Sequence, residues 1–325
     1  MSISEATDTN NVTIADIAVA AERIRPYAHR TPVFSSHGIN ELVGAKVCFK
    51  AENMQKVGAF KFRGACNAVF SLSDEEVARG VITHSSGNHA AALALAARLR
   101  GCEAVIVMPD NAPTVKKDAV ASYGARIEFC DSNEEAREAA VRALQAQTPR
   151  ELVHPFNDVR IVAGQGTAAR ELLEDYPDLQ AVFAPVGGGG LLSGTAIAAK
   201  AHGAAVYGAE PAAADDAARS LRAGKIIPVD HPRTIADGLR TSLGPVTFAI
   251  IRRDVNDIVT VSERAIIRAM RLLWERLKLV VEPSGAVPLA VLLEHGVPSG
   301  VERVGVILSG GNVDLGRLPW TNIPP

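Results

Sequence analysis

A run of four glycines most constrains how this chain of 325 residues can fold. Gly187–Gly190 follows an apolar segment over 181–186 and precedes a segment of helical composition over 191–202. The same order of apolar segment, small residues and helix recurs at Thr83–His89 and Leu308–Asp314. In open α/β sheets, such turns lie beyond the carboxyl ends of the strands, where ligands bind. Together they predict an α/β fold with parallel-rich sheets flanked by helices.

Hydrophobic periodicity locates the individual elements along the chain. The predicted strands cover 46–50, 81–84, 104–108, 126–130, 181–186, 205–209 and 304–308. The predicted helices cover 12–27, 64–72, 89–99, 114–123, 134–147, 164–175, 191–202, 262–277 and 285–295. Composition marks no linker between them, so it sets no domain boundary.

The glycine run has two interpretations. It could be a flexible turn, although four consecutive glycines cost more conformational entropy than a turn needs. It could instead be a phosphate cup, in which backbone N–H groups and the start of a helix meet an anion. Neither a Walker loop nor a dinucleotide fingerprint fits, because the Lys-Ser/Thr pair and the expected acidic residue are missing. The phosphate cup is favoured, and its ligand stays open at this point.

Lys61 lies between Phe60 and Phe62 in the segment VGAFKFRGA. If these rings keep water from the amine, its pKa falls and it becomes a better nucleophile toward an aldehyde. If the segment is a strand, alternation leaves Lys61 exposed between two buried rings. The phosphate cup favours the first interpretation, because a lysine and a phosphate cup are what a pyridoxal phosphate site requires.

Composition and charge exclude several classes of protein. The net charge of −2 gives no basic face for nucleic acid, and no apolar run reaches the length of a membrane span. The N-terminal MSISEATDTNN lacks the regions of a signal peptide and predicts a disordered tail. Cys48, Cys66, Cys102 and Cys130 form no CxxC pair and are expected to be buried structural thiols. Reduced thiols without an export signal predict a cytoplasmic protein.

Several segments in order resemble one family over about 12–315. They are GAFKFRGA, THSSGNH, KK with YGA downstream, HPFND, GQGT, PVGGGGLLSG, GAEP, TIADG, VVEPSGA and LSGGNVDL. With these segments the chain resembles the fold-type II pyridoxal-phosphate enzymes, whose fold is similar to the tryptophan synthase β chain. Within them it is most similar to the serine racemase, serine/threonine dehydratase and 3-hydroxyaspartate dehydratase group. The form GAFKF, in place of the more frequent SFK, is similar to certain microbial racemases and 3-hydroxyaspartate dehydratases.

The resemblance implies a cofactor site for pyridoxal 5′-phosphate. Lys61 would carry it as a Schiff base, with Phe60 beside its ring and Asn88 bonded to its phenolic oxygen. Gly238 would lie against it, Glu282 near it, and Ser309 would face its pyridine nitrogen. Its phosphate would be held by Gly187, Gly188, Gly189, Gly190 and Leu191.

The resemblance also implies substrate and metal residues. The substrate carboxylate would be held by the loop containing Ser85, Ser86, Asn88 and His89, and Arg137 would reach the substrate. Ser86 would be the second acid/base of a racemase, opposite Lys61. A divalent cation, Mg²⁺ or alternatively Ca²⁺ or Mn²⁺, would be bound by Glu210, the Ala214 carbonyl and Asp216.

These residues predict a β-hydroxy amino acid ammonia-lyase acting on 3-hydroxyaspartate, serine or threonine, with serine racemisation as the alternative. A hydroxyaspartate carries a second carboxylate and needs a further cation, for which Arg137 and His89 are candidates. The segments VVEPSGA and GAEPAAADD argue against a β-replacement enzyme. The intact segment SSGNH argues against a non-catalytic cofactor-binding protein. A nucleotide-binding regulator is less favoured than either of these. The resemblance also implies a homodimer. Each chain would have a large cofactor domain (1–75 and 153–325) and a small substrate-loop domain (76–152) that closes on the substrate.

Overall fold

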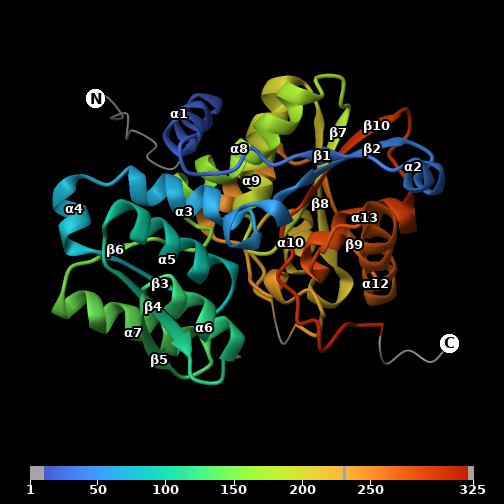
Figure 1. Ribbon diagram of the computed structural model, residues 1–325. Coiled ribbons are helices and arrows are strands. Elements are labelled where there is room, and N and C mark those ends of the chain that lie inside the picture. The colour runs from blue at the N-terminus through green and yellow to red at the C-terminus, as the bar shows by residue number, and fades with distance from the viewer. Residues whose placement is uncertain (1–10, 113, 230–231, 321–325) are drawn as a thin grey trace.

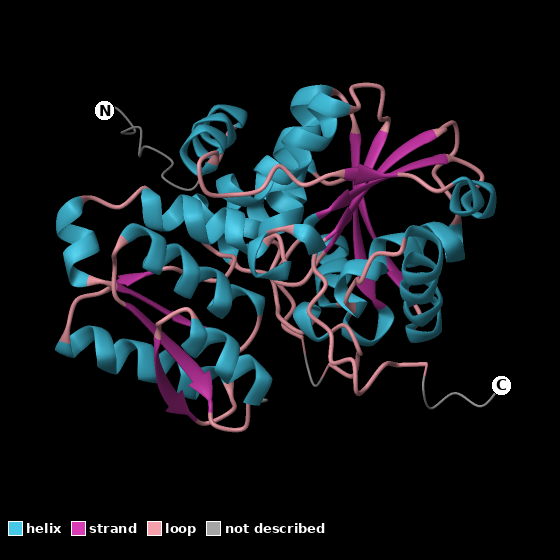
Figure 2. Cartoon of the chain, viewed as in Figure 1, coloured by secondary structure: helices cyan, strands magenta, loops and turns pink. Residues whose placement is uncertain are grey.

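Two sheets form the framework of the protein (Figures 1 and 2). The structure, a computed structural model, describes residues 11–112, 114–229 and 232–320, so residues 1–10 of the expected disordered tail lie outside the described residues. One sheet has six strands in the order β1-β2-β10-β7-β8-β9, and the other has four in the order β5-β4-β3-β6. Only β1 and β2 pair antiparallel among the described strands. The predicted parallel-rich α/β fold is therefore confirmed.

The strands include every strand predicted from periodicity and three more. They are β1 Val33–Phe34, β2 Lys46–Ala51, β3 Val81–His84, β4 Ala104–Pro109, β5 Arg126–Cys130, β6 Glu151–Leu152, β7 Ala181–Pro185, β8 Ala205–Pro211, β9 Asp257–Val261 and β10 Arg303–Leu308. The prediction missed β1, β6 and β9. The first two have only two residues each, which is too short for a period of two to show.

The helices flank both sheets. They are α1 Ile14–Ile24, α2 His37–Val43, α3 Lys61–Phe70, α4 Asp74–Arg79, α5 Asn88–Arg100, α6 Thr114–Ser122, α7 Glu134–Gln147, α8 Val159–Asp175, α9 Gly190–His202, α10 Asp216–Ala223, α11 Pro245–Asp254, α12 Glu263–Leu272 and α13 Pro283–His295. Short helical turns are η1 Glu52–Met54, η2 Lys56–Gly58, η3 Ala212–Ala214, η4 Asp237–Leu239 and the π-helical η5 Leu273–Leu277. Helix α3 begins at Lys61, three residues before the predicted start, so Lys61 is not on a strand.

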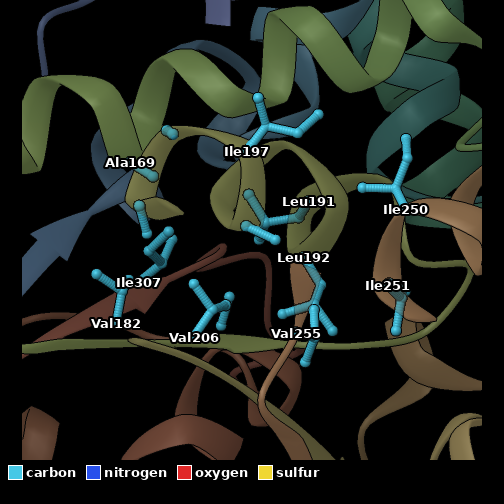
Figure 3. Close-up of a cluster of buried hydrophobic side chains, with 14 of the residues drawn as sticks. Ala169, Val182, Leu191, Leu192, Ile197, Val206, Ile250, Ile251, Val255 and Ile307 are labelled. Atoms are coloured by element: carbon cyan, nitrogen blue, oxygen red, sulfur yellow. The ribbon is translucent and has the colours of Figure 1, made fainter. Parts of the chain in front are cut away.

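The six-stranded sheet is covered on both faces, which explains its continuous apolar strands. On β7, Val182 and Ala184 pack into one buried cluster, and Ala181 and Phe183 pack into another on the opposite face. Figure 3 shows the first cluster, in which strand residues such as Val206 meet side chains of α9 and α11. Because both faces of this sheet are buried, we expect polar functional residues at its carboxyl edge.

A third core joins the segment carrying Lys61 to the four-stranded sheet. Phe62 and Cys66 of α3 pack in one buried cluster with Leu93 of α5 and Ile106 of β4. All strands of the four-stranded sheet lie within the predicted small domain, 76–152. The division of the chain into two domains that move relative to each other stays a prediction.

The described part of the chain contains no helix long and apolar enough to cross a membrane. The four cysteines are free. Cys48 and Cys66 are buried as expected, whereas Cys102 and Cys130 are only partly buried, so the expectation was wrong for these two. Burial raises the pKa of all four thiols, which makes them weak nucleophiles near neutral pH.

Candidate active site

Lys61 is fixed at the carboxyl edge of the six-stranded sheet. The preceding residues pair with the loop that follows β10: the Phe60 amide donates to the Ser309 carbonyl at 3.0 Å, and Ala59 forms a bridge with Gly310. The Gly311 amide donates to the Gly58 carbonyl at 2.9 Å. These contacts hold the start of α3 beside the end of β10, so Lys61 projects from a rigid segment.

The amine of Lys61 is largely removed from water. Its Nζ donates to the Pro155 carbonyl at 2.7 Å and lies 5.2 Å from the centre of the Phe60 ring. Burial lowers the pKa of Lys61 from 10.5 to about 8. The desolvated amine predicted from the sequence is therefore present, and it contacts the Pro155 carbonyl as well as the Phe60 ring.

The glycine run forms a buried loop between β7 and α9 at the same edge of the sheet. Strands β7 and β10 are parallel neighbours, so this loop lies next to the Ser309–Gly311 loop that holds Lys61. No backbone hydrogen bond among the described residues uses the amides of Gly187, Gly188 or Gly189. The first amides of α9 also lack partners within the helix. A set of free, buried N–H groups is what a bound phosphate would satisfy.

Glycine is required in this loop mainly for close packing. A Cβ at Gly188 would lie 2.2 Å from the ring of Phe156, and one at Gly187 would lie 3.0 Å from the Leu239 Cα. Gly189 also has a φ of 87°, a conformation that other residues rarely adopt. Leu191 packs its side chain into the core, so only its backbone amide can meet a ligand.

A polar network surrounds Asn88, the first residue of α5. Asn88 Nδ2 donates to both carboxylate oxygens of Glu282, at 3.0 and 3.2 Å, and its Oδ1 accepts from Asn312 Nδ2 at 2.9 Å. The Asn312 amide also donates to Glu282, at 3.1 Å. These contacts fix which side of the Asn88 amide is the donor. Burial raises the pKa of Glu282 to about 7 despite these hydrogen bonds.

Two histidines near Lys61, His89 and His154, are uncharged near neutral pH. Burial, and then the charge of Lys61, push the pKa of His89 well below its usual value, and its Nε2 lies 3.1 Å from the Val153 carbonyl. Burial also lowers the pKa of His154 to about 4. Two backbone amides, those of Phe156 and Asn157, donate to Nδ1 of His154. Neither ring offers a positive charge to a substrate.

The remaining predicted site residues lie at three places. Ser85 and Ser86 are in the partly exposed loop between β3 and α5, adjoining Asn88. Gly238 is in η4, where its amide donates to Ser284 Oγ at 3.1 Å and its carbonyl lies against Gly187. Ser309 is buried at the end of β10. These positions bring the predicted cofactor residues to one edge of the six-stranded sheet, with the Ser85–Asn88 loop tied to it through Asn88.

Arg137 has its contacts near its own helix, α7, and the end of β5. It is in the first turn of α7, and its Nε donates to the Asn133 carbonyl at 3.2 Å. Its charge acts on the thiol of Cys130 at the end of β5. No hydrogen bond or ion pair among the described residues links Arg137 to Lys61 or Asn88.

The predicted metal residues form a separate buried group. Both carboxylate oxygens of Glu210 accept backbone amides at the start of α10, from Ala217 at 2.8 Å and Ala218 at 2.9 Å. Both oxygens of Asp216 are buried without any hydrogen-bond partner. Burial raises the pKa of Glu210 to about 8 and that of Asp216 to about 7. No group of three or more His, Cys, Asp or Glu side chains suited to a metal occurs within the described ranges, so a cation here would also need carbonyl oxygens.

The segment His154–Asn157, from the motif HPFND, was given no role from the sequence. It supplies the carbonyl that holds Lys61, the ring that covers Gly188, and an Asn157 Oδ1 that accepts the Val246 amide at 2.9 Å. Asn312, in LSGGNVDL, was also given no role. The segment His154–Asn157 and Asn312 both lie inside motifs that carried the family resemblance. That position was the only signal in the sequence that could have identified them.

Comparison with known proteins agrees with this site. The sequence matches the family described as pyridoxal-phosphate dependent enzyme over residues 24–310. It is 50% identical over 310 residues to a beta-hydroxyaspartate dehydratase of Paracoccus denitrificans (strain Pd 1222), covering 95% of this chain and 98% of that protein. It is 48% identical over 308 residues to an L-threo-3-hydroxyaspartate ammonia-lyase of Saccharomyces cerevisiae (strain ATCC 204508 / S288c), covering 94% of each.

Solved structures share the whole fold. The serine racemase of Dictyostelium discoideum has a TM-score of 0.90 at 48% identity, covering 94% of this chain and 99% of that one. A maize serine racemase has a TM-score of 0.92 at 49% identity, covering 94% and 95%. The chain therefore belongs to the pyridoxal-phosphate-dependent enzymes of fold-type II, in the group that contains serine racemases, threonine deaminases and hydroxyaspartate ammonia-lyases.

Proposed function

We propose that this enzyme removes the β-hydroxyl and the α-amine of a β-hydroxy amino acid, giving an oxo acid and ammonia. The observation that carries the proposal is the position of Lys61, an amine of lowered pKa beside a buried glycine loop with free amides. Relatives named as a hydroxyaspartate dehydratase and a hydroxyaspartate ammonia-lyase, each about half identical over nearly the whole chain, support this reaction.

The residues present fit pyridoxal phosphate. The amides of Gly187–Gly189 and the start of α9 would hold its phosphate, Lys61 would bind it covalently, and Ser309 would face its pyridine nitrogen. When bound, the cofactor supplies an electron sink for the pair released at the substrate α-carbon. A serine hydroxyl does not enforce a protonated pyridine nitrogen as a carboxylate would, which favours prompt loss of the β-hydroxyl.

The chain supplies the proton transfers and the substrate grip. With cofactor and substrate bound, the Lys61 amine would accept the α-proton, since its lowered pKa keeps part of the amine neutral near pH 7. Ser85, Ser86 and Asn88, at the start of α5, would hold the substrate carboxylate through their donors and the partial positive charge of the helix end. His89 would act there only as a neutral group.

Racemisation is the second candidate. Ser86 is the residue that would return a proton to the opposite face of the α-carbon, and a serine racemase is 48% identical over 313 residues. The ratio of elimination to racemisation would then depend on Ser86. With Ser86→Ala, we propose that racemisation is lost while elimination persists.

A substrate panel tests the proposed function. The holoenzyme is expected to release ammonia from at least one of L-serine, L-threonine and the 3-hydroxyaspartate isomers, and chiral analysis of the remaining amino acid measures racemisation. An enzyme that racemises serine and releases no ammonia from any of these would overturn elimination in favour of the second candidate.

The lowered pKa of Lys61 predicts a pH profile for cofactor attachment. Attack on the aldehyde needs the neutral amine, so the rate at which apoprotein binds pyridoxal phosphate covalently should rise roughly tenfold per pH unit and level off near pH 8. With an ordinary lysine, of pKa 10.5, the rate of cofactor attachment would keep rising for more than two further pH units. Stopped-flow absorbance on apoprotein measures this rate, and a continued rise above about pH 9 would contradict the assignment.

We also propose that a divalent cation, such as Mg²⁺, binds Glu210, Asp216 and the Ala214 carbonyl. The two unpartnered oxygens of Asp216 support it, because a cation would offset the cost of burying that carboxylate. Chelation should lower activity and the thermal midpoint, and Mg²⁺ at about 100 times its Kd should restore roughly 2.7 kcal/mol of stability.

Asp216→Asn should remove this response to Mg²⁺, while Asp215→Asn, next to it but paired with Arg219 at the surface, should keep it. Equal thermal midpoints with chelator, Mg²⁺, Ca²⁺ and Mn²⁺ would remove the cation from the proposal.

We further propose that the enzyme is a homodimer, which the family likeness supports. We also propose that it is located in the cytoplasm, with which four thiols of raised pKa are compatible.

A further inference from the structure

We infer that Lys116 binds the side-chain carboxylate of a dicarboxylic β-hydroxy amino acid, and that it does so by exchanging its ion-pair partner, Asp237, for the substrate. This inference rests on the proposed function, because it concerns which substrate the same site prefers. It replaces Arg137 and His89, the two cations expected from the sequence, with a residue to which the sequence gave no role.

A hydroxyaspartate requires such a cation. Moving a carboxylate out of water without a positive partner is costly, and serine has no carboxylate at this position. Lys61 is committed to the cofactor and to the α-proton. His89 and His154 are uncharged near neutral pH, as burial lowers the pKa of both rings. Arg137 is turned back onto the Asn133 carbonyl of its own helix.

Lys116 is placed at the junction of the two sheets. It lies on α6, which flanks the four-stranded sheet (Figure 1). Its Nζ is 2.8 Å from Oδ2 of Asp237 in η4. The residue after Asp237 is Gly238, whose carbonyl would lie 3.1 Å from a Cβ on Gly187 of the glycine loop. The Lys116 ammonium is therefore held at the segment that covers the expected phosphate site.

Electrostatics link the same pair to the substrate loop. Asp237 raises and Lys116 lowers the pKa of the buried Glu282, so the charges of both reach the interior. Both oxygens of Glu282 are bonded to Asn88, which begins the helix after the Ser85–Gly87 loop. A carboxylate arriving beside Asn88 would meet the field of Lys116.

The exchange of partners is cheap because the existing pair is exposed. The side chains of Lys116 and Asp237 are 37% and 49% exposed, and exposed pairs contribute at most about 1 kcal/mol. Asp237 would return to water when released. The ammonium is on a flexible four-carbon stem that can turn toward a new partner without backbone movement. A substrate carboxylate in a less hydrated site would bind it more strongly than Asp237 does.

The test is the ratio of kcat/KM for 3-hydroxyaspartate to kcat/KM for L-serine, measured on holoenzyme by ammonia release. Lys116→Met should lower this ratio roughly tenfold to hundredfold, mainly through KM for hydroxyaspartate, since a hydrogen bond to a charged group is lost. Lys116→Arg should restore most of the ratio. Asp237→Asn should move it the other way, lowering KM for hydroxyaspartate because the competing carboxylate is gone.

Lys117→Met is the matched control. Lys117 is on the same helix, but its Nζ donates to the Asp110 carbonyl and lies 5.1 Å from the Phe129 ring, within the small-sheet part of the chain. The ratio of kcat/KM values for the Lys117→Met variant should equal that of the unchanged enzyme. An unchanged ratio in Lys116→Met, or a fall in Arg137→Met instead, would overturn the inference. An enzyme active on serine but not on any hydroxyaspartate would also overturn it while leaving the proposed elimination intact.

Discussion

Replacing Lys61 with alanine is expected to abolish the visible absorption of the bound cofactor and to lower kcat/KM at least about 10³-fold. The variant loses both the covalent attachment and the amine that accepts the α-proton. Its fold should be retained, because alanine suits the first turn of α3 and the Phe60–Ser309 and Ala59–Gly310 pairing uses only backbone atoms. Absorbance spectra of the purified protein and ammonia release measure the two effects.

Two further variants separate chemistry from charge. Lys61→Arg keeps a cation that cannot attach to an aldehyde, so it should be as inactive as the alanine variant. Lys56→Ala removes a lysine from the same segment, one that lies 5.5 Å from the Phe62 ring, and should keep both absorption and turnover. Turnover by Lys61→Ala within about tenfold of the unchanged enzyme would refute the role of Lys61.

Arg63→Met is expected to cause the largest loss of stability, roughly 3–5 kcal/mol, although Arg63 touches no predicted ligand. The guanidinium is fully buried two residues after Lys61. It makes paired hydrogen bonds to Glu52, at 2.7 and 2.8 Å, and to Glu171, at 2.7 and 2.8 Å. Methionine fills similar volume but leaves buried carboxylates without their main partner.

The network around Arg63 balances its charges. Lys50 donates to Glu171 at 2.6 Å, and the Thr31 hydroxyl donates to Glu52 at 2.6 Å. The two cations, Arg63 and Lys50, therefore face two carboxylates, those of Glu52 and Glu171. Burial pushes the pKa of Glu171 up, but Arg63 and Lys50 together outweigh it and hold the pKa below 4.5. Glu171 therefore contributes stability above its unfolded pKa, and this contribution is lost as pH falls through the lowered folded value.

Thermal unfolding of the cofactor-bound protein measures the effect of Arg63→Met. Arg30→Met is the matched control: its guanidinium pairs with Glu174 and Asp175 at 53% exposure, so its removal should cost less than about 1 kcal/mol. Arg63→Lys should fall between, because a single ammonium cannot make the paired contacts. A midpoint for Arg63→Met equal to that of Arg30→Met would show that the network is not needed for stability.

Periodicity located the long elements because they are governed by near neighbours in the chain. Every strand of five or more residues except β9 was predicted. The helices α2, α4, α10 and α11 were missed. The first three have at most eight residues, so few residues carry their pattern, whereas α11 has ten and was missed despite its length. Lys61 itself was ambiguous, since Phe-Lys-Phe reads as alternation until the helix start is known.

The sequence by itself determined the α/β fold class, and it predicted the glycine loop and Lys61 as the attachment lysine, because these features are expressed in contiguous residues. Only the tertiary structure decided what surrounds them. Lys61 meets the Pro155 carbonyl, Arg63 meets Glu171, and Lys116 meets Asp237 across about a hundred residues or more. Such contacts depend on how the two sheets are placed, and no local pattern records that. The same packing is what turns a lysine between two phenylalanines into an amine with a pKa of about 8.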